Sequence, residues 1–230
     1  MNNDLFHYPR PSVTVDCVVF GYDGEQLSVL LLNRKEAPFA NQWTLLGGFL
    51  QLEETFEEAT ERILSHKAGL TGLYLEQLYT FGGLDRDPRG RVLSVSYYAL
   101  VNPRQFELVV GQMANDLRWC SIDDLPVLGF DHNHIIEIAR GRLAAKVTYQ
   151  PVGFELLNEQ FTMTELQDLY ERILGEVLDR RNFYKKMMAS GILKSTGERR
   201  TGLKSRPAEL FMFDKLLYNQ LVKEGFQFKI

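Results

Sequence analysis

The chain has 230 residues, of which 45% are hydrophobic and 24% are charged, and its formal net charge is -4. This composition excludes a disordered or fibrous protein, and the length suits two domains. No apolar run approaches the roughly 20 residues of a membrane span, and the N-terminal segment MNNDLFHYPRP lacks an apolar signal core. We therefore expect a cytoplasmic protein with no membrane partner. Cys17 and Cys120 have no CxxC spacing, so we expect two buried free thiols.

Charge is distributed unevenly along the chain. Residues 1–154 carry 13 basic and 19 acidic side chains, whereas residues 155–230 carry 13 basic and 11 acidic ones. Residues 180–206 hold nine basic side chains and a single acid, Glu198. This concentration of positive charge in the C-terminal third predicts an anionic partner there.

The first 120 residues read as alternating strands and turns. VTVDCVVFGYDGEQLSVLLLNR predicts two strands joined by a Gly-Tyr-Asp-Gly turn, and LYLEQLYTFGGL and VLSVSYYALV predict further strands. Apolar residues at helical spacing predict helices over residues 53–68, ended by Gly69, and over residues 133–145. The irregular segment TYQPVGF then indicates a boundary, which divides the chain into domains 1–150 and 151–230.

The C-terminal domain follows a recognisable order of elements. FTMTELQDLYERIL predicts an amphipathic helix with Thr162 or Thr164 as its N-cap, and Gly175 ends it. Asp179 is placed to cap a second helix, RRNFYKKMMAS. Two strands around a Gly- and Arg-rich loop and a final helix over residues 214–224 follow. A helix, a short turn, a basic helix and a strand pair predict a winged helix-turn-helix.

The segment GGFLQLEETFEEATERILSHKAGL resembles the Nudix box, in which G, five residues, E and seven residues precede R-E-U-x-E-E-x-G-U, where U is apolar. The positions that match are Gly48, Glu54, Arg62, Leu64, Gly69 and Leu70. Three positions differ, because Ile63, His66 and Lys67 stand where the family has the glutamates that bind magnesium. An ammonium group repels a cation and isoleucine has no donor atom, so we expect no enzymatic activity, no cofactor and no metal.

Two alternatives concern metal chemistry. A hydrolase could draw its carboxylates from the neighbouring acids Glu53, Glu54, Glu57 and Glu58, but these lie a helical turn or more from the expected ligand positions. His132 and His134 resemble a metal pair, yet no cysteine or third ligand is near, and a place at the start of a helix is the favoured interpretation.

The segments RPSVTVDCVVF, WTLLGG and LDRDPRGRVLSVSYYAL are similar to those of Nudix-related transcriptional regulators, and this resemblance covers nearly the whole chain. It implies an α+β protein in which an N-terminal Nudix-like α/β/α sandwich with a mixed sheet precedes the C-terminal winged helix. It further implies a homodimeric repressor that releases double-stranded operator DNA when an effector binds. Family members sense ADP-ribose or sugars. Because Lys67 and Ile63 disfavour a magnesium-bound diphosphate, we expect a pentose such as L-arabinose, with ADP-ribose as the alternative.

The basic helix and the wing supply the candidate DNA contacts. Arginine and asparagine can read base edges in the major groove, and lysines can contact phosphates. The alternative is a merely solvated basic face. The candidates are Arg180, Arg181, Asn182, Tyr184, Lys185 and Lys186 on the helix, and Lys194, Arg199, Arg200, Lys204 and Arg206 on the wing.

Most of the candidate effector residues have two possible roles. The loop DRDPRGR either lines a pocket or is a charged hairpin turn. Asp16 either hydrogen-bonds a sugar hydroxyl or lies in solvent on the polar side of its strand, and Arg62 either reaches the pocket or bridges a carboxylate of its own helix. The full set is Asp16, Arg34, Phe49, Arg62, Asp85, Arg86 and Arg89.

Overall fold

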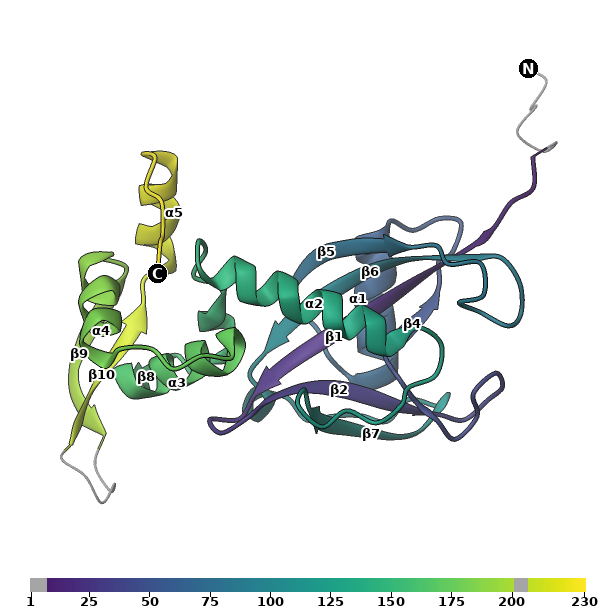
Figure 1. Ribbon diagram of the computed structural model, residues 1–230, viewed down its shortest axis with the longest axis horizontal. Coiled ribbons are helices and arrows are strands. Elements are labelled where there is room, and N and C mark those ends of the chain that lie inside the picture. Colours follow the sequence, from purple (N-terminus) through teal and green to yellow (C-terminus); the bar gives the residue numbers. More distant parts are fainter. Residues whose placement is uncertain (1–7, 201–206) are drawn as a thin grey trace. The chain divides into compact units, whose positions relative to one another are not determined.

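The computed structural model describes residues 8–200 and 207–230, which form two compact units (Figure 1). The first unit contains the N-terminal segment through Val19 together with Val29–Ala99 and Phe106–Glu137. The second contains Ile138–Ile230 together with two short stretches of the N-terminal half, Phe20–Ser28 and Leu100–Gln105. No helix within the described ranges is long and apolar enough to cross a lipid bilayer.

A seven-stranded sheet is the scaffold of the first unit. Its strands follow the order β3-β2-β1-β6-β5, while β4 pairs with β1 and β7 pairs with β2. The strands are β1 (Ser12–Tyr22), β2 (Leu27–Arg34), β3 (Trp43–Thr44), β4 (Leu46–Phe49), β5 (Tyr74–Phe81), β6 (Val92–Val101) and β7 (Ala114–Ser121). The predicted hairpin consists of β1 and β2. Gly21 and Tyr22, which were predicted to lie in the turn, belong to β1, so the connection between the strands begins at Asp23. The short strands β3 and β4, and the eight-residue β7, were not predicted.

The sheet is mixed, as the resemblance implied. Strands β1 and β6 run in the same direction, since the Ser12 N–H donates to the Arg91 carbonyl and the Thr14 hydroxyl to the Leu93 carbonyl. Strand β4 runs antiparallel to β1, and in this register Asp16 lies opposite Gly47. The strand pairing therefore brings a carboxylate of β1 against the glycine pair that precedes the Nudix-box helix.

That helix, α1 (Phe56–Ala68), begins later than the predicted residue 53 because Thr55 caps it. The Thr55 side chain accepts from the Glu58 N–H, and the Glu58 carboxylate accepts from the Thr55 N–H, which forms a capping box. Gly69 ends the helix in the left-handed conformation with φ of 71°, as predicted. The helix packs against β4, and Figure 1 shows it behind the sheet.

The second unit contains the predicted winged helix elements in the predicted order. These are α3 (Met163–Leu174), α4 (Arg180–Ala189), β9 (Leu193–Arg200), β10 (Ala208–Phe213) and α5 (Lys215–Lys223). Ahead of them lie α2 (His132–Val147), which begins in the first unit, the 3-10 helix η3 (Val152–Leu156) and β8 (Gln160–Thr162). A three-stranded sheet has the order β8-β10-β9. Of the two candidate caps, Thr162 is the N-cap of α3, and Gly175 ends that helix. Both cysteines are free and buried, as expected.

Candidate effector pocket and DNA-binding face

A cavity of about 210 Å³ lies in the first unit, beside the β1 and β4 pair. Charged side chains of both signs line it, namely Asp16, Arg34, Glu36, Lys67, Arg86, Asp87 and Arg89. Phe49, Phe130, His132 and Met113 contribute most of the remaining large side chains. The cavity thus combines several cations with aromatic rings, a composition suited to an anionic ligand that also has a flat group.

Arg86 anchors the floor of the cavity in a buried ion-pair network. Its Nη2 lies 2.8 Å from Asp131 Oδ1 and 3.2 Å from Asp16 Oδ2, while the Ser94 hydroxyl donates to Asp16 Oδ2 over 2.6 Å. Burial by itself raises the pKa of the Asp16 carboxyl, but His132, Ser94 and Arg86 outweigh it and hold that pKa below its usual range. Arg86 therefore stabilises the fold around the cavity. Its positive charge is already paired with Asp131 and Asp16, so it is a poor candidate for binding a ligand.

His132 is fixed by the backbone of the segment between β3 and β4. The Leu45 N–H donates to His132 Nδ1 over 2.9 Å, and Nε2 faces Asp16 Oδ1 at 3.6 Å. His134 instead is 60% exposed and faces Glu137. The two histidines point to different neighbours, in agreement with the favoured interpretation that they mark the start of a helix.

The mouth of the cavity carries stacked cationic and aromatic groups. The Arg89 guanidinium lies 5.0 Å from the centre of the Phe49 ring, which is 46% exposed, and the Arg34 guanidinium lies 5.3 Å from the Phe130 ring. Asp87 holds Arg89 in place through hydrogen bonds of 3.0 and 2.7 Å. Planar groups of this kind can stack on a flat ring of a ligand and bind its negative charge.

The three unusual Nudix-box positions have different surroundings. Ile63 is buried beneath the glycine pair, with its Cδ1 3.2 Å from the place where a Cβ of Gly48 would lie. His66 is exposed and does not line the cavity. Lys67 does line it, and its Nζ donates to the Gly47 carbonyl. Burial lowers the pKa of Lys67 and nearby Arg34 lowers it further, against the opposite influence of Asp16.

Arg62 and Asp85 lie outside the cavity lining. Arg62 forms an ion pair with Glu54 at 2.5 Å and also donates to the Phe49 carbonyl over 3.1 Å. The hydrogen bonds from Arg62 lower the pKa of Glu54 to about 2. Arg62 therefore bridges a carboxylate and supports the end of β4, which was one of its two predicted roles, while Asp85 is exposed on its loop.

The residues present do not fit the magnesium ion of the Nudix family. Within residues 8–200 and 207–230, no group of three or more His, Cys, Asp or Glu side chains could hold a metal ion. Of the neighbouring acids, Glu54 is paired with Arg62, Glu58 belongs to the helix cap, and Glu57 accepts a hydrogen bond from the Tyr97 hydroxyl at 2.8 Å. No step that depends on a metal is derived from this site.

Five of the seven predicted effector residues line one cavity, namely Asp16, Arg34, Phe49, Arg86 and Arg89. Sequence reasoning missed Lys67, Phe130 and His132 as lining residues. Lys67 occupies a metal-ligand position of the Nudix box, which could have marked it as a lining residue, but its presence was interpreted only as the loss of a glutamate. Phe130 has a φ of 59°, a conformation that no sequence pattern announced.

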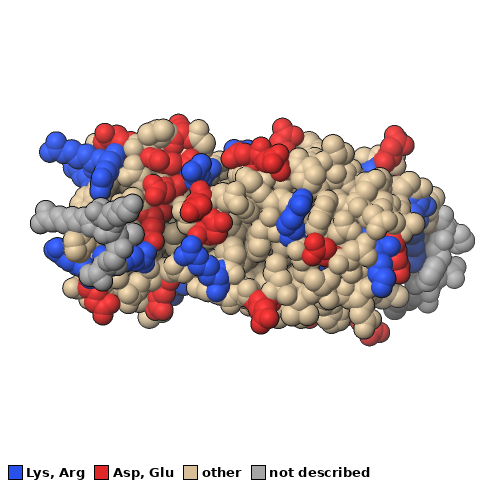
Figure 2. Space-filling view, turned by 90° about the horizontal axis from the view of Figure 1, so that it is seen from below, with Lys and Arg blue, Asp and Glu red and all other residues tan. Residues whose placement is uncertain are grey.

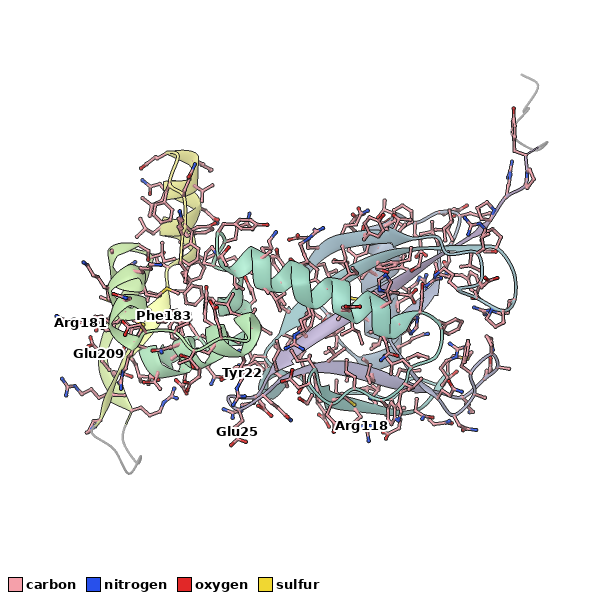
Figure 3. The ribbon with its side chains drawn as sticks, viewed as in Figure 1. Tyr22, Glu25, Arg118, Arg181, Phe183 and Glu209 are labelled. Carbon is pink, nitrogen blue, oxygen red and sulfur yellow. The ribbon has the colours of Figure 1, made fainter. Side chains whose placement is uncertain are left out.

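In the second unit, α4 presents a basic face to solvent. Asp179 caps the helix by accepting from the Asn182 N–H, and Phe183 and Met187 are buried on its inner side. The Phe183 ring contacts that of Tyr170 at 5.5 Å. Figure 3 shows Arg181 pointing away from the unit and Phe183 pointing into it. The exposed side chains of α4 include all six predicted contacts, Arg180, Arg181, Asn182, Tyr184, Lys185 and Lys186.

The predicted wing residues are less uniform. Arg199 is exposed, whereas Lys194 pairs with Asp214 at 2.5 Å and Arg200 pairs with Glu165. These two pairs tie the wing strand to the caps of α5 and α3, so less of their charge is available to a partner. Lys204 and Arg206 lie outside the described residues. Figure 2 shows Lys and Arg side chains interspersed with Asp and Glu side chains on the surface of the second unit.

A hollow of about 490 Å³ lies between the start of α3, the start of α4 and β10. It is lined by Thr162, Met163, Thr164, Gln167, Arg180, Arg181, Tyr184, Ala208, Glu209 and Phe211. Hydroxyl groups, an amide and two guanidinium groups at helix N-termini are suited to contacts with a phosphate backbone. Three further exposed side chains of α4, Asn182, Lys185 and Lys186, extend this surface, which together has the composition of a nucleic-acid contact.

The two units define a class of protein, a Nudix-fold domain joined to a winged helix. The NUDIX domain family matches residues 10–139, and the NrtR DNA-binding winged helix domain family matches residues 153–213. The chain is 36% identical over 210 residues to the ADPR responsive transcriptional repressor NtrR of Acinetobacter baylyi. The matched segment covers 90% of this chain and 83% of that relative.

Two crystal structures from Shewanella oneidensis support the same assignment. NrtR complexed with a 27mer DNA is 35% identical, covers 87% of this chain and 93% of that chain, and has a TM-score of 0.75. The NUDIX domain of NrtR complexed with ADP ribose is 36% identical, covers 62% of this chain and 94% of that one, and has a TM-score of 0.57. The chain belongs to the NrtR family of DNA-binding transcriptional repressors. The predicted fold class and winged helix are confirmed.

Proposed function

We propose that this chain represses transcription by binding operator DNA through α4 and the wing, and that ADP-ribose bound in the first unit releases the DNA. The observation that carries the choice of effector is an excess of positive charge in the cavity lining, which holds four basic side chains and three carboxylates. Among the described residues, Arg34 and Lys67 form no ion pair, and each donates to a backbone carbonyl, Arg34 to that of Pro38 and Lys67 to that of Gly47.

The charge of the cavity favours ADP-ribose over the pentose that the sequence suggested. A neutral sugar would leave Arg34 and Lys67 without an ion-pair partner among the described residues, whereas a diphosphate supplies negative charge inside the cavity. The stacked pair of Phe49 and Arg89 at the mouth suits the adenine ring. Two of the relatives described above point the same way, since the Acinetobacter repressor is named as ADPR responsive and the NUDIX domain of Shewanella NrtR forms a complex with ADP ribose.

Binding without hydrolysis follows from the same residues. The position of each lost glutamate offers no oxygen to a metal, because Ile63 is buried, His66 is exposed outside the cavity and Lys67 is a cation. Of the four acids that a hydrolase could use instead, Glu54, Glu57 and Glu58 are engaged in other contacts, and Glu53 is exposed outside the cavity lining. We propose a sensor that leaves its ligand intact.

We propose further that the repressor acts as a homodimer on a palindromic operator, since two-fold symmetry of the protein requires two-fold symmetry of its site. The arginines of α4 would read base edges, and the lysines would contact phosphates. Effector binding must favour one dimer geometry over another for the DNA to be released.

The test is a gel-shift titration of the full chain on the DNA upstream of its own gene, at fixed salt, with ADP-ribose, L-arabinose and D-xylose added separately. We expect ADP-ribose to abolish the shift and both sugars to leave it unchanged. Release by a sugar alone would restore the pentose hypothesis. Chromatography of the recovered ADP-ribose, after incubation with magnesium, should show no AMP; its accumulation would show that the chain is a hydrolase.

A further inference from the structure

We infer that the Lys67 ammonium takes the place of the divalent metal ion of the Nudix family, so that this pocket binds a diphosphate group without any metal. The inference rests on the proposed function in one respect, that the ligand carries a diphosphate. The inference goes beyond the proposed function because it assigns the role of the metal ion, which neutralises the diphosphate, to the Lys67 side chain of this protein.

The ammonium group of Lys67 lies at the edge of the cavity that is formed by α1 and β4. Lys67 lies one helical turn after Ile63 on α1, on the face that packs against β4. Its Nζ donates to the carbonyl of Gly47, and both residues line the cavity. Because Gly47 lies opposite Asp16 in the β1 and β4 register, the ammonium is held where the strands meet the Nudix-box helix.

The hydrogen-bonding capacity of Lys67 is not exhausted by this contact. An ammonium group has three donors, and the structure assigns one of them to the Gly47 carbonyl. Arg34 supplies a second cation, whose Nε is bonded to the Pro38 carbonyl. Two donors of Lys67 and the outer nitrogens of Arg34 therefore remain for phosphate oxygens. Phosphate bound there would also raise the pKa of Lys67, opposing the effect of burial.

The cavity beside Lys67 offers a divalent cation no set of free carboxylate ligands. Three carboxylates line the cavity. Asp16 already accepts from Ser94 and Arg86, Asp87 is paired with Arg89 at 2.7 Å, and Glu36 is exposed. Glu54, on the other side of the glycine pair, is neutralised by Arg62. A metal placed beside Lys67 would meet an ammonium group instead of the carboxylate that the family provides.

The test is calorimetric titration of the full chain with ADP-ribose and, separately, with inorganic pyrophosphate, each in EDTA and in magnesium. We expect both probes to bind with the same Kd in the two buffers, within about twofold. Lys67→Met should weaken both about 10- to 100-fold, because a charge-assisted hydrogen bond is lost, and magnesium should not restore them. Lys67→Arg should retain most of the affinity.

The matched control is Lys35→Met, which removes the same charge from an exposed lysine outside the cavity and should change neither Kd. Binding only in magnesium would overturn the inference and leave ADP-ribose as the effector. Equal affinities of the Lys67→Met and Lys35→Met proteins would also overturn it. Metal-free, Lys67-dependent binding of pyrophosphate without binding of ADP-ribose would instead overturn the proposed effector, and failure of both probes would overturn both.

Discussion

Gly47 faces Asp16 so closely that a Cβ on Gly47 would lie 1.9 Å from the Asp16 Oδ1. The same Cβ would lie 2.9 Å from the Val15 carbonyl oxygen, which belongs to the backbone and cannot move away alone. Position 47 thus excludes any side chain as long as the Asp16 carboxylate keeps its place between Ser94 and Arg86.

Gly47→Ala should therefore destabilise the first unit by about 1 to 3 kcal/mol, the range typical of overpacking. Urea unfolding followed by circular dichroism measures this. Gly48→Ala is the matched control, because its Cβ would meet only the flexible end of Ile63 at 3.2 Å, and we expect a smaller loss. Equal losses for the two variants would show that the contact with Asp16 is unimportant.

Arg86→Met should cost roughly 3 to 5 kcal/mol of unfolding free energy, since it leaves the buried carboxylate of Asp16 without its guanidinium partner. The side chains of Arg86 and Asp16 are 4% and 9% exposed, so water does not compensate. Arg91→Met, at an exposed arginine that bonds only to carbonyls, should cost much less. A small effect at Arg86 would contradict an anchoring role for the network.

The ion pair of Glu54 and Arg62 predicts a pH dependence in acid. The folded-state pKa of Glu54 is lowered from 4.5 to about 2, so its contribution to stability is present above pH 4.5 and is lost as pH falls towards 2. The urea midpoint of Glu54→Gln should fall less steeply over this window than that of the parent chain. Parallel curves would show that the pair contributes nothing.

Phe49→Ala should weaken ADP-ribose binding about tenfold, in keeping with the loss of one stacked base, and should leave pyrophosphate binding unchanged. The reason is that the ring lies against Arg89 at the mouth, where the cation-π distance is 5.0 Å, and contributes no charge. Calorimetry with both ligands measures the difference. An equal loss for the two ligands would mean that Phe49 shapes the whole pocket.

Arg181→Ala should weaken operator binding about 10- to 100-fold at fixed salt and leave ADP-ribose binding intact. Arg181 is exposed on α4 and points into solvent (Figure 3). Fluorescence anisotropy with labelled operator DNA measures the affinity. Lys223→Ala, at an exposed lysine on α5, is the charge-matched control and should bind DNA normally. If Arg181→Ala also binds normally, the contact surface lies on the wing.

The winged helix could be predicted closely because its elements are specified by local interactions. Thr162 and Asp179 cap their helices through side chains three residues from the N–H groups they accept from, and Gly175 supplies the left-handed C-cap. The basic face of α4 follows from the burial of Phe183 and Met187 four residues apart. Such signals lie within a few residues of the feature they determine, so the sequence alone contains them.

The Nudix-box helix and its altered positions could also be predicted, since spacing is a property of the chain. What only the tertiary structure decided is the meaning of those alterations. Sheet register sets Asp16 against Gly47, and long-range contacts bring Arg34, Arg86 and His132 to the same cavity. The tertiary structure therefore makes Lys67 a fixed cation in the same cavity as Arg34. This role depends on the pairing of segments that are distant in sequence, and the loss of a glutamate from the motif does not reveal it.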